Sequence, residues 1–312
     1  MTTEKIIVIT PNVALDRTLV VPDFEIGNIS RIKRGIAVPG GKGLNVMRAV
    51  GILKGQPLAM GLLGGHTGQM IAEMVEKDHY EAEWTWYEGE TRTCTIIADK
   101  DGVSTVINES GQIEADDWRH LVDDICRMAD DATTICLCGS LPLGAPDDAP
   151  GDLVERLNAM GKHVWVDSSG SALQSAIQAK PYAIKVNGDE IGEVLNMPVQ
   201  SLKQAQEAAT RLIDDGIHVV VITLGADGAM LVSKEVTAKA TPPQITPVDP
   251  VASGDCVHAG IVTALAKGDD FTEAIRAGVA AGTVNALYAG GAQFPYEHYQ
   301  EILAQTTIEI LA

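Results

Sequence analysis

The sequence predicts an α/β fold in which a mostly parallel sheet carries helices on both faces. Three observations lead to this class. Short apolar runs typical of buried strands alternate with helical patterns along most of the 312 residues. Hydrophobic residues make up 46% of the chain and aromatic residues only 4%, and 31 glycines are available for turns. Such a composition suits a parallel sheet, whose strands are buried on both faces.

Six apolar runs are interpreted as buried strands because each is short and bounded by polar or glycine residues. In chain order they are KIIVIT (5–10), PLAMGLL (57–63), TTICLC (133–138), HVWVD (163–167), AIKV (183–186) and HVVVIT (218–223). Helical spacing of apolar residues occurs at 44–54, 68–77, 118–129, 152–160 and 202–215. Alternation of strand and helix predicts parallel pairing.

Two segments, at about 16–38 and 82–108, break this alternation. Both show strand-like alternation of apolar and polar residues interrupted by turns. They are expected to form antiparallel strands outside the main sheet, as a small lid. The sequence contains no interdomain linker, repeat or low-complexity segment, so residues 1–312 are expected to form a single domain with these lid segments.

Charge and cysteine content exclude some classes of partner. Acidic residues outnumber basic ones 42 to 23, for a formal net charge of −19, which argues against a nucleic-acid or anionic-membrane partner. The sequence shows no signal-peptide pattern and no apolar run long enough to span a bilayer. Five cysteines, an odd number, favour a reducing compartment, so a cytoplasmic location is expected. Cys136 and Cys138 are interpreted as core thiols rather than metal ligands.

One stretch of this acidic chain, residues 26–72, contains no Asp or Glu. Its basic residues are Arg31, Lys33, Arg34, Lys42, Arg48 and Lys54. A solvated basic face would explain the pattern. A local site for an anionic substrate, which the overall charge would repel, would explain it as well.

The segment DPVASGDCVHAGIVTALAKG (249–268) places small residues and then Asp255 at the start of an apolar helical pattern. Capping of the helix by Ser253 or Asp255 is one explanation. The alternative is an anion site, because unpaired N–H groups and the helix dipole attract negative charge, and small residues let a phosphate approach. Asp255 would then accept a proton from the group that attacks the phosphate.

A glycine-rich element, PGGKGLNVMRAVGIL (39–53), precedes the second predicted strand. Gly40, Gly41 and Gly43 would let the backbone approach a ligand, while Lys42 supplies charge and Asn45 lies on the first helical turn. The element matches neither G-x-x-x-x-G-K-[ST] nor G-x-G-x-x-G. A flexible turn explains the element equally well when it is taken alone.

Seven segments, taken in order, resemble motifs of the PfkB branch of the ribokinase-like superfamily. They are TPNVALDRT (10–18), GGKGLNVMRAV (40–50), CGSLPLG (138–144), VDSSGSAL (166–173), IKVNGDE (184–190), TLGADGA (223–229) and DPVASGDCVHAG (249–260). The first of them, the lysine of GGKG and GETRTC (89–94) look like the sugar-phosphate kinases of that branch. Pro250 and Ala252 depart from the motif D-T-x-G-A-G-D, in which Thr and Gly are usual.

The resemblance implies a ribokinase-like, doubly wound sheet with a small β lid. It also implies transfer of a phosphoryl group from ATP, with Mg²⁺, to a ketohexose phosphate by direct in-line attack. Fructose 1-phosphate, phosphorylated at O6 to fructose 1,6-bisphosphate, is the expected reaction. Tagatose 6-phosphate and fructose 6-phosphate remain alternatives within the class. Outside it, the chain would be a non-catalytic sugar-phosphate sensor, because fold alone does not assign function.

The resemblance also assigns roles to residues around the reacting groups. Asp255 would be the general base, and the N–H groups of Ala252, Ser253, Gly254 and Asp255 would hold the charge on the transferred phosphate. The sugar phosphate would be bound by Asp16, Gly40, Gly41, Lys42, Asn45, Arg92 and Ser140. Within this set, Lys42 and Arg92 would pair with the phosphate already on the sugar. A strand-end turn for Asp16, an exposed strand arginine for Arg92 and a simple turn for Ser140 are the alternatives.

The nucleotide is expected at the next strand ends. By resemblance it would be bound by Lys185, Asn187, Thr223, Gly225, Gly228 and Asn285, with the adenine near Asn285 and residues 240–247. Glu190 would organise Mg²⁺ through water. Capping of a helix by Asn187 and Glu190 is the alternative, because N-x-x-E is also a capping-box pattern.

Lids of this family often pair across a homodimer, which is therefore an expected partner besides the sugar phosphate and ATP. Trp84 and Trp86, at alternating spacing, would suit the face of such a lid. The alternative is that both tryptophans pack within their own chain.

Overall fold

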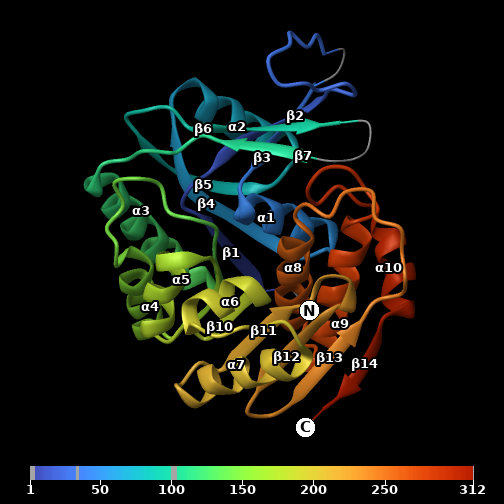
Figure 1. The fold of residues 1–312 in the computed structure, drawn as a ribbon. Helices are drawn as coiled ribbons and strands as arrows, with labels where there is room; N and C mark the ends of the chain where they lie inside the picture. Colours follow the sequence, from blue (N-terminus) through green and yellow to red (C-terminus); the bar gives the residue numbers. More distant parts are fainter. Residues whose placement is uncertain (1–3, 33–34, 100–103, 312) are drawn as a thin grey trace.

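The computed structural model describes residues 4–32, 35–99 and 104–311, which form two sheets and the helices around them (Figure 1). The strands are β1 (Lys5–Thr10), β2 (Ala14–Val20), β3 (Gly35–Gly40), β4 (Gln56–Gly64), β5 (Glu81–Tyr87), β6 (Arg92–Ala98), β7 (Ser104–Asn108), β8 (Ala132–Cys138), β9 (His163–Asp167), β10 (Ala183–Asn187), β11 (Val219–Thr223), β12 (Ala229–Ser233), β13 (Thr237–Thr241) and β14 (Thr307–Ile310). The helices are α1 (Lys42–Ile52), α2 (Gly65–Lys77), α3 (Ala115–Met128), α4 (Ala149–Ala159), α5 (Gly170–Gln178), α6 (Gly188–Leu195), α7 (Leu202–Asp214), α8 (Ser253–Ala266), α9 (Phe271–Asn285) and α10 (Tyr296–Gln305).

The main sheet has the strand order β14-β13-β12-β11-β10-β9-β8-β1-β4-β5. Its strands pair in parallel from β11 to β5, with Ile7 of β1 opposite Leu58 of β4 and Ile135 of β8. The last three strands, β12 to β14, pair antiparallel at one edge. The prediction of a mostly parallel α/β sheet is confirmed.

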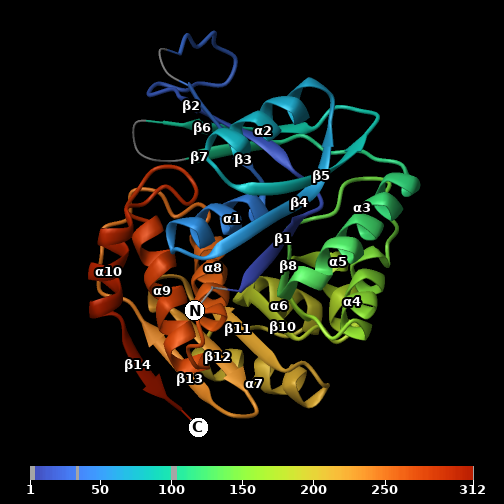
Figure 2. The ribbon, with the colours of Figure 1, turned by 180° about the vertical axis from the view of Figure 1, so that it is seen from behind.

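Helices cover both faces of this sheet, as predicted (Figures 1 and 2). Along β1, Ile6 and Val8 join one hydrophobic core with α1, α2, α8, α9 and α10. Ile7 and Ile9 point the opposite way into a second core with α3, α4, α5, α6 and α7. The apolar run 5–10 therefore lacks polar alternation because both of its faces are covered.

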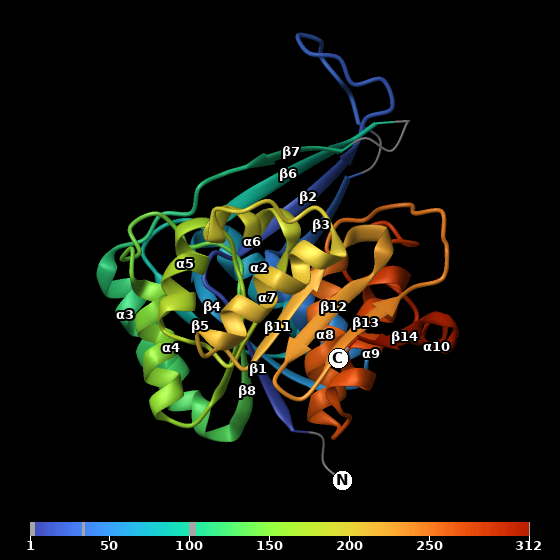
Figure 3. The same ribbon diagram turned by 60° about the horizontal axis from the view of Figure 1, so that its bottom comes forward.

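The small sheet has the order β3-β2-β6-β7 and projects away from the helical layers, as Figure 3 shows. It confirms the prediction of a second layer, with two differences. Strand β2 pairs with β6 in parallel, so the small sheet is mixed rather than antiparallel. Residues 33–34 and 100–103 of the predicted lid segments lie outside the described residues.

The second difference concerns residues 82–87, which were expected in the lid. They belong to β5, which pairs in parallel with β4 at the edge of the main sheet. An edge strand exposes one side, so it alternates like a lid strand and misleads the prediction. Trp84 packs against the first core and Trp86 is half-exposed, so neither tryptophan lies on the small sheet.

Several elements were not predicted from the sequence: α5, α9, α10 and the antiparallel strands β12, β13 and β14. Helix α9 is rich in Ala and Gly and is buried nearly all round, so it lacks the amphipathic pattern on which prediction depends. Among the described residues, no helix combines the length and the apolar character that a bilayer crossing requires.

The topology gathers several strand ends at one place. Strands β1, β8, β9, β10 and β11 run in parallel, so their carboxyl ends meet at one edge of the sheet. The chain leaves β1 into the small sheet and returns through α1 to β4, while β8 pairs on the other side of β1. Ligands of doubly wound sheets bind at such a switch point.

Candidate active site

The start of α8 lies at this edge and has an unusual backbone. Ala252, which precedes the helix, has φ of 62°, in the left-handed region that costs a non-glycine residue about 1–2 kcal/mol. A Cβ on Gly254 would lie 3.2 Å from Nζ of Lys185, so the glycine leaves room for this cation. The Ser253 N–H, predicted to hold phosphate charge, instead donates to the Pro250 carbonyl oxygen at 3.1 Å. The small residues, the other first N–H groups of the helix and a nearby ammonium together suit an anion.

Asp255 lies in the first turn of α8 and is only 6% exposed. Within the described part of the chain, α8 has no side-chain capping bond. Asp255 instead accepts a hydrogen bond from Nδ2 of Asn45, at 2.9 Å from Oδ2. The carboxylate is therefore held by α1 rather than used as a cap.

Arg48 fixes the orientation of Asn45. Its Nη2 donates to Oδ1 of Asn45 at 2.6 Å, which leaves the amide NH₂ facing Asp255. The guanidinium also donates to the carbonyl oxygens of Pro39 (2.6 Å) and Gly291 (3.1 Å from Nη2). Arg48 is 4% exposed, so a buried cation joins the end of β3, the helix α1 and the loop after α9.

The pKa of Asp255 reflects opposing influences. Burial raises it most, and the negative charge of Asp167 raises it further. Lys185, the hydrogen bond from Asn45 and Lys42 lower it, so that the pKa is about 6. A carboxyl group with this pKa is ionised at neutral pH yet basic enough to accept a proton.

Asp167, at the end of β9, is fully buried and joins two lysines. Its Oδ2 lies 2.6 Å from Nζ of Lys185, and its Oδ1 lies 3.0 Å from Nζ of Lys42. Burial alone would raise the pKa of Asp167, but the charges of Lys185 and Lys42 hold it well below its usual range. Nδ1 of His258 lies 3.7 Å from Oδ2, and burial lowers the pKa of this histidine.

Lys42 bridges Asp167 and Glu190, whose Oε1 is 3.3 Å from Nζ. Burial alone would lower the pKa of Lys42, but the charges of Asp167, Glu190 and Asp255 raise it, so the lysine stays protonated. Lys42 was predicted to pair, together with Arg92, with the phosphate already on the sugar, whereas the structure places it among carboxylates at the ends of β9 and β10.

Asn187 and Glu190 form the capping box that was the alternative interpretation. Oδ1 of Asn187 accepts from the Glu190 N–H at 2.8 Å, and Oε2 of Glu190 accepts from the Asn187 N–H at 2.9 Å. Glu190 also forms an ion pair with Lys42, so its carboxylate both caps α6 and lies beside the lysine that Asp167 holds. Among the described residues, no three His, Cys, Asp or Glu side chains are grouped so that they could hold a metal ion directly.

The remaining predicted nucleotide residues lie in two places. Thr223 ends β11 and donates to the Val186 carbonyl, and the turn that follows holds Gly225 and Gly228 at φ of 60° and 88°. Asn285 differs from the prediction, because it is fully buried and both of its polar atoms are engaged. Its Nδ2 donates to the Val251 carbonyl and to Oγ of Ser253, while Oδ1 accepts from the Ala292 N–H. Asn285 therefore supports the loop before α8 and presents no free group to a nucleotide.

Asp16 lies on β2 against the glycine pair that precedes α1. A Cβ on Gly40 would overlap its carboxyl group, and Gly41, at φ of 97°, donates its N–H to it. Burial raises the pKa of Asp16, while the charges of Arg48 and Arg92 and a hydrogen bond from Cys94 lower it. Gly40 and Gly41 therefore place a carboxylate beside the site.

Arg92 and Ser140 meet at Asn12, a residue that the prediction did not single out. Arg92 donates to the Asn12 carbonyl oxygen from Nη2 at 3.1 Å, and Nδ2 of Asn12 donates to Oγ of Ser140 at 3.2 Å. Arg92 also reaches the Asn108 side chain and the Glu109 carbonyl. All these acceptors are uncharged, so the guanidinium keeps its charge available for an anion.

The site thus has two polar groups of residues at one edge of the sheet. The first joins the start of α8 to Asn45, Arg48, Lys185, Asp167, Lys42 and Glu190. The second contains Asp16, Arg92, Asn12 and Ser140. Sequence reasoning missed Asn12, Arg48, Asp167 and His258 as members of the site, although Arg48 lies in the acid-free stretch three residues after Asn45 and Asp167 ends a predicted strand.

Comparison with known proteins gives relatives along nearly the whole chain. A family model described as pfkB family carbohydrate kinase matches residues 7–298. The 1-phosphofructokinase of Bacillus subtilis (strain 168) is 30% identical over 280 residues, which are 89% of this chain and 91% of that protein. Phosphofructokinase-2 of Escherichia coli, in complex with substrates and products, has a TM-score of 0.89 at 25% identity, over 96% of this chain and 98% of that one. A structure of its tetrameric inhibited form has a TM-score of 0.90 at 24% identity, over 97% and 98%. Ribokinase of Thermotoga maritima, at 19% identity over 97% and 99%, shares the fold with a TM-score of 0.76.

The contact between Asn45 and Asp255 predicts a measurable titration. In Asn45→Ala, the carboxylate loses a hydrogen bond that favours its charged form, so the pKa of Asp255 should rise above its value of about 6. Carboxyl ¹³C NMR as a function of pH measures this. Asn158→Ala, which removes an exposed amide that bonds only backbone carbonyls, should leave it unchanged. A lower pKa in Asn45→Ala would contradict the role given to this contact.

Proposed function

The chain belongs to the pfkB family of carbohydrate kinases, and we propose that it transfers a phosphoryl group from ATP to O6 of fructose 1-phosphate with Asp255 as general base. The family and the ribokinase-like fold predicted from the sequence are confirmed. The chain is an ATP-dependent sugar kinase of the phosphofructokinase type. The exact substrate, the base and the metal belong to the proposal.

The observation that carries the proposal is the buried carboxyl group of Asp255 at the start of α8. It combines a pKa of about 6 with a position beside Lys185 and the first N–H groups of a helix. A carboxylate beside such an anion site would not bind phosphate itself. It is suited to accept the proton of a hydroxyl that attacks the phosphate.

The proposed step balances as follows. Asp255 accepts the proton of the C6 hydroxyl, and O6 forms a bond to the γ-phosphorus of ATP. The bond from that phosphorus to the β–γ bridging oxygen breaks, and ADP leaves with its electron pair. Charge on the transferred group would be held by the N–H groups of Ala252, Gly254 and Asp255, with Lys185 and Lys42 nearby. The Ser253 N–H is left out because it donates to the Pro250 carbonyl. The products are ADP, fructose 1,6-bisphosphate and a protonated Asp255.

The residues around α8 fit a nucleotide triphosphate with its magnesium. Lys42 and Lys185 offer positive charge at the ends of β9 and β10, and a Cβ on Gly225 would meet no atom within 4 Å, so the turn after β11 is open. Glu190, with a partly exposed side chain, would hold the hydrated ion through water. Mg²⁺, when bound, would neutralise phosphate charge and orient the phosphates.

The phosphate already on the sugar is assigned to the second group of residues. Arg92 donates there only to uncharged acceptors, and Asp16 on the neighbouring strand, whose pKa the charge of Arg92 lowers, would accept hydrogen bonds from sugar hydroxyls. Lys42, expected beside Arg92, is instead held by Asp167 and Glu190. We therefore move Lys42 in the proposal from the sugar's phosphate to the transferred phosphate.

Fructose 1-phosphate is favoured over tagatose 6-phosphate and fructose 6-phosphate because the Bacillus subtilis relative is a 1-phosphofructokinase. Either 6-phosphate would place its phosphate at Arg92 and its C1 hydroxyl at Asp255. The non-catalytic sensor is disfavoured because a sensor has no need of a carboxylate tuned to accept a proton at this position.

We also propose a homodimer through the small sheet. The register of β3, β2, β6 and β7 puts Ile36 and Val106 on the face that carries Asp16. Val20, Ile36 and Val106 are exposed on that face by 42%, 42% and 48%. Apolar faces of this kind mark interaction sites. Sedimentation velocity at micromolar concentration would test the dimer, and a monomer under those conditions would contradict it.

Asp255→Asn should lower kcat by about 10²–10⁴-fold, because the amide keeps the shape and cannot act as a base. Sugar-phosphate binding, measured calorimetrically, should stay within about twofold because the group that holds the sugar's phosphate is untouched. The expected result is lost turnover with retained binding. A variant with half the kcat of the unmodified enzyme would refute the assignment.

The kcat/KM values for fructose 1-phosphate, tagatose 6-phosphate, fructose 6-phosphate and fructose should rank fructose 1-phosphate first and fructose last. Arg92→Ala should raise KM for the favoured sugar phosphate about 10–100-fold by loss of charge-assisted bonds, with KM for ATP nearly unchanged. Arg17→Ala, an exposed change on the opposite face of β2, is the matched control. A tenfold preference for either 6-phosphate would overturn the choice of fructose 1-phosphate as substrate. Equal effects of Arg92→Ala on KM for the sugar phosphate and on KM for ATP would overturn the role given to Arg92.

A further inference from the structure

His258 is a fully buried histidine to which the proposed reaction gives no part. It lies on α8, three residues after Asp255, so the two side chains share one face of the helix. Asp255 faces the anion site at the start of α8, whereas His258 faces Asp167 and Cys138 at the ends of β9 and β8. The imidazole therefore lies beside the buried carboxylate that joins the two lysines of the site.

The two carboxylate oxygens of Asp167 are held in different ways. Oδ1 accepts a hydrogen bond from Nζ of Lys42 at 3.0 Å. Oδ2 is buried and has no partner with hydrogen-bond geometry among the described residues, although Nζ of Lys185 lies 2.6 Å away. Nδ1 of His258, at 3.7 Å, is too distant for a hydrogen bond. Charge and packing hold Oδ2, so its position depends on the groups beside it.

The surroundings of the imidazole select one of its forms. Burial lowers the pKa of His258, Asp167 opposes this effect and the charges of Lys185 and Lys42 add to it, so the ring is neutral at neutral pH. Within the described part of the chain, Nε2 is buried without a hydrogen-bond partner, and a proton there would be an unpaired donor. A proton on Nδ1 instead faces the Asp167 carboxylate and the Cys138 sulfur, 3.8 Å away. The surroundings thus favour the tautomer that carries its proton on Nδ1.

Packing fixes the direction of this ring. The centroid of the Trp165 ring lies 5.8 Å from that of His258, and the two planes are inclined by 37°. Trp165 is 1% exposed and lies two residues before Asp167 on β9, so both side chains point to the same face of the sheet. A close-packed interior keeps side chains in single rotamers, so Nδ1 stays directed at the carboxylate.

We propose that His258 is a positioning residue, whose Nδ1–H holds Oδ2 of Asp167 in place and thereby keeps Lys185 beside the start of α8. The inference rests on the proposed function, because Lys185 is there assigned to the phosphates of ATP. Without the N–H, Oδ2 loses a favourable dipole and Lys185 loses a fixed partner. ATP should then bind more weakly, although His258 itself touches no substrate.

The variants His258→Asn and His258→Leu separate this role from simple filling of space. The Asn amide can place an N–H where Nδ1 stands, whereas Leu has no donor but suits a buried apolar site better. Calorimetric titration of the full chain with Mg²⁺ and ATP, without sugar, should show an affinity about tenfold lower in the Leu variant. The Asn variant should stay within about threefold of the unmodified chain.

Thermal unfolding should rank the two variants in the opposite order, with the Leu variant more stable than the Asn variant. An Asn variant that binds ATP no better than the Leu variant would overturn the proposal. ATP affinities that follow the order of stability would also overturn it, because His258 would then only fill space.

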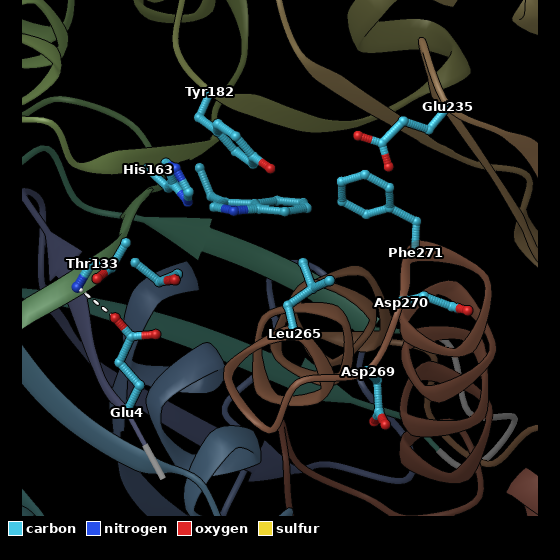
Figure 4. A pocket seen from close by; sticks show the side chains of 11 residues that line it. Glu4, Thr133, His163, Tyr182, Glu235, Leu265, Asp269, Asp270 and Phe271 are labelled. Atoms are coloured by element: carbon cyan, nitrogen blue, oxygen red, sulfur yellow. Dashed lines mark hydrogen bonds between the residues drawn. The ribbon is translucent and has the colours of Figure 1, made fainter.

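His218→Leu is the matched control. His218 is a partly buried histidine packed on Tyr182 and Phe271, which line a hollow of about 400 Å³ at the amino ends of β8 and β9 (Figure 4). These ends are opposite to the ones that carry the site, so ATP affinity should stay within about twofold. Weakening equal to that in His258→Leu would contradict the role given to His258.

The tautomer of His258 can be measured in the unmodified chain. A long-range ¹H–¹⁵N spectrum at about pH 7 should show a neutral ring protonated on Nδ1. A proton on Nε2, or on both nitrogens, would overturn the proposal. Neither this spectrum nor the ATP titration involves a sugar, so failure of fructose 1-phosphate as a substrate would refute the proposed function and leave this test intact.

Discussion

The site depends on the buried ion pair between Asp167 and Lys185. The two charged atoms lie 2.6 Å apart, Asp167 is fully buried and Lys185 is 4% exposed. Either charge alone would be strongly unfavourable there, because burial removes its hydration, so each one requires the other. Asp167 also receives Lys42 from α1, which draws a second cation toward the start of α8. One carboxylate thus holds two lysines where a triphosphate would place its negative charge.

Asp255 is tuned by the same charges. Asp167 raises its pKa while Lys185 and Lys42 lower it, and the hydrogen bond from Asn45 favours the ionised form. Arg48 orients that amide and also bonds Pro39 at the end of β3. The position of the small sheet and the state of the base are therefore linked through one buried arginine. Coupling of this kind requires the charges to be buried, since exposed charges are screened.

The sequence predicted the parallel sheet and most of the residues at its carboxyl edge, because buried strands and glycine-rich loops leave clear local patterns. It could not assign β5, since an edge strand alternates like a lid strand. It also misjudged residues whose roles depend on distant neighbours. Lys42 was assigned with Arg92 to the phosphate on the sugar, but its partner Asp167 lies 125 positions away along the chain. Asn285 was predicted to bind the nucleotide, but its side chain is fully buried and makes three hydrogen bonds within the chain. Arg48 and Asp167 gave only weak local signals, in the acid-free stretch and at the end of a predicted strand, because tertiary packing defines their roles.

The pH dependence of kcat/KM in Asp167→Asn tests the central claim most directly, because kcat/KM reports the ionisation of the free enzyme. In the unmodified enzyme, activity should rise with pH as Asp255 loses its proton near pH 6. Removing the charge of Asp167 takes away an influence that raises this pKa, so the acidic limb should move to lower pH. Titration of the substrates' phosphates is common to both enzymes and cancels in the comparison. An acidic limb that stays in place or moves to higher pH would contradict the account.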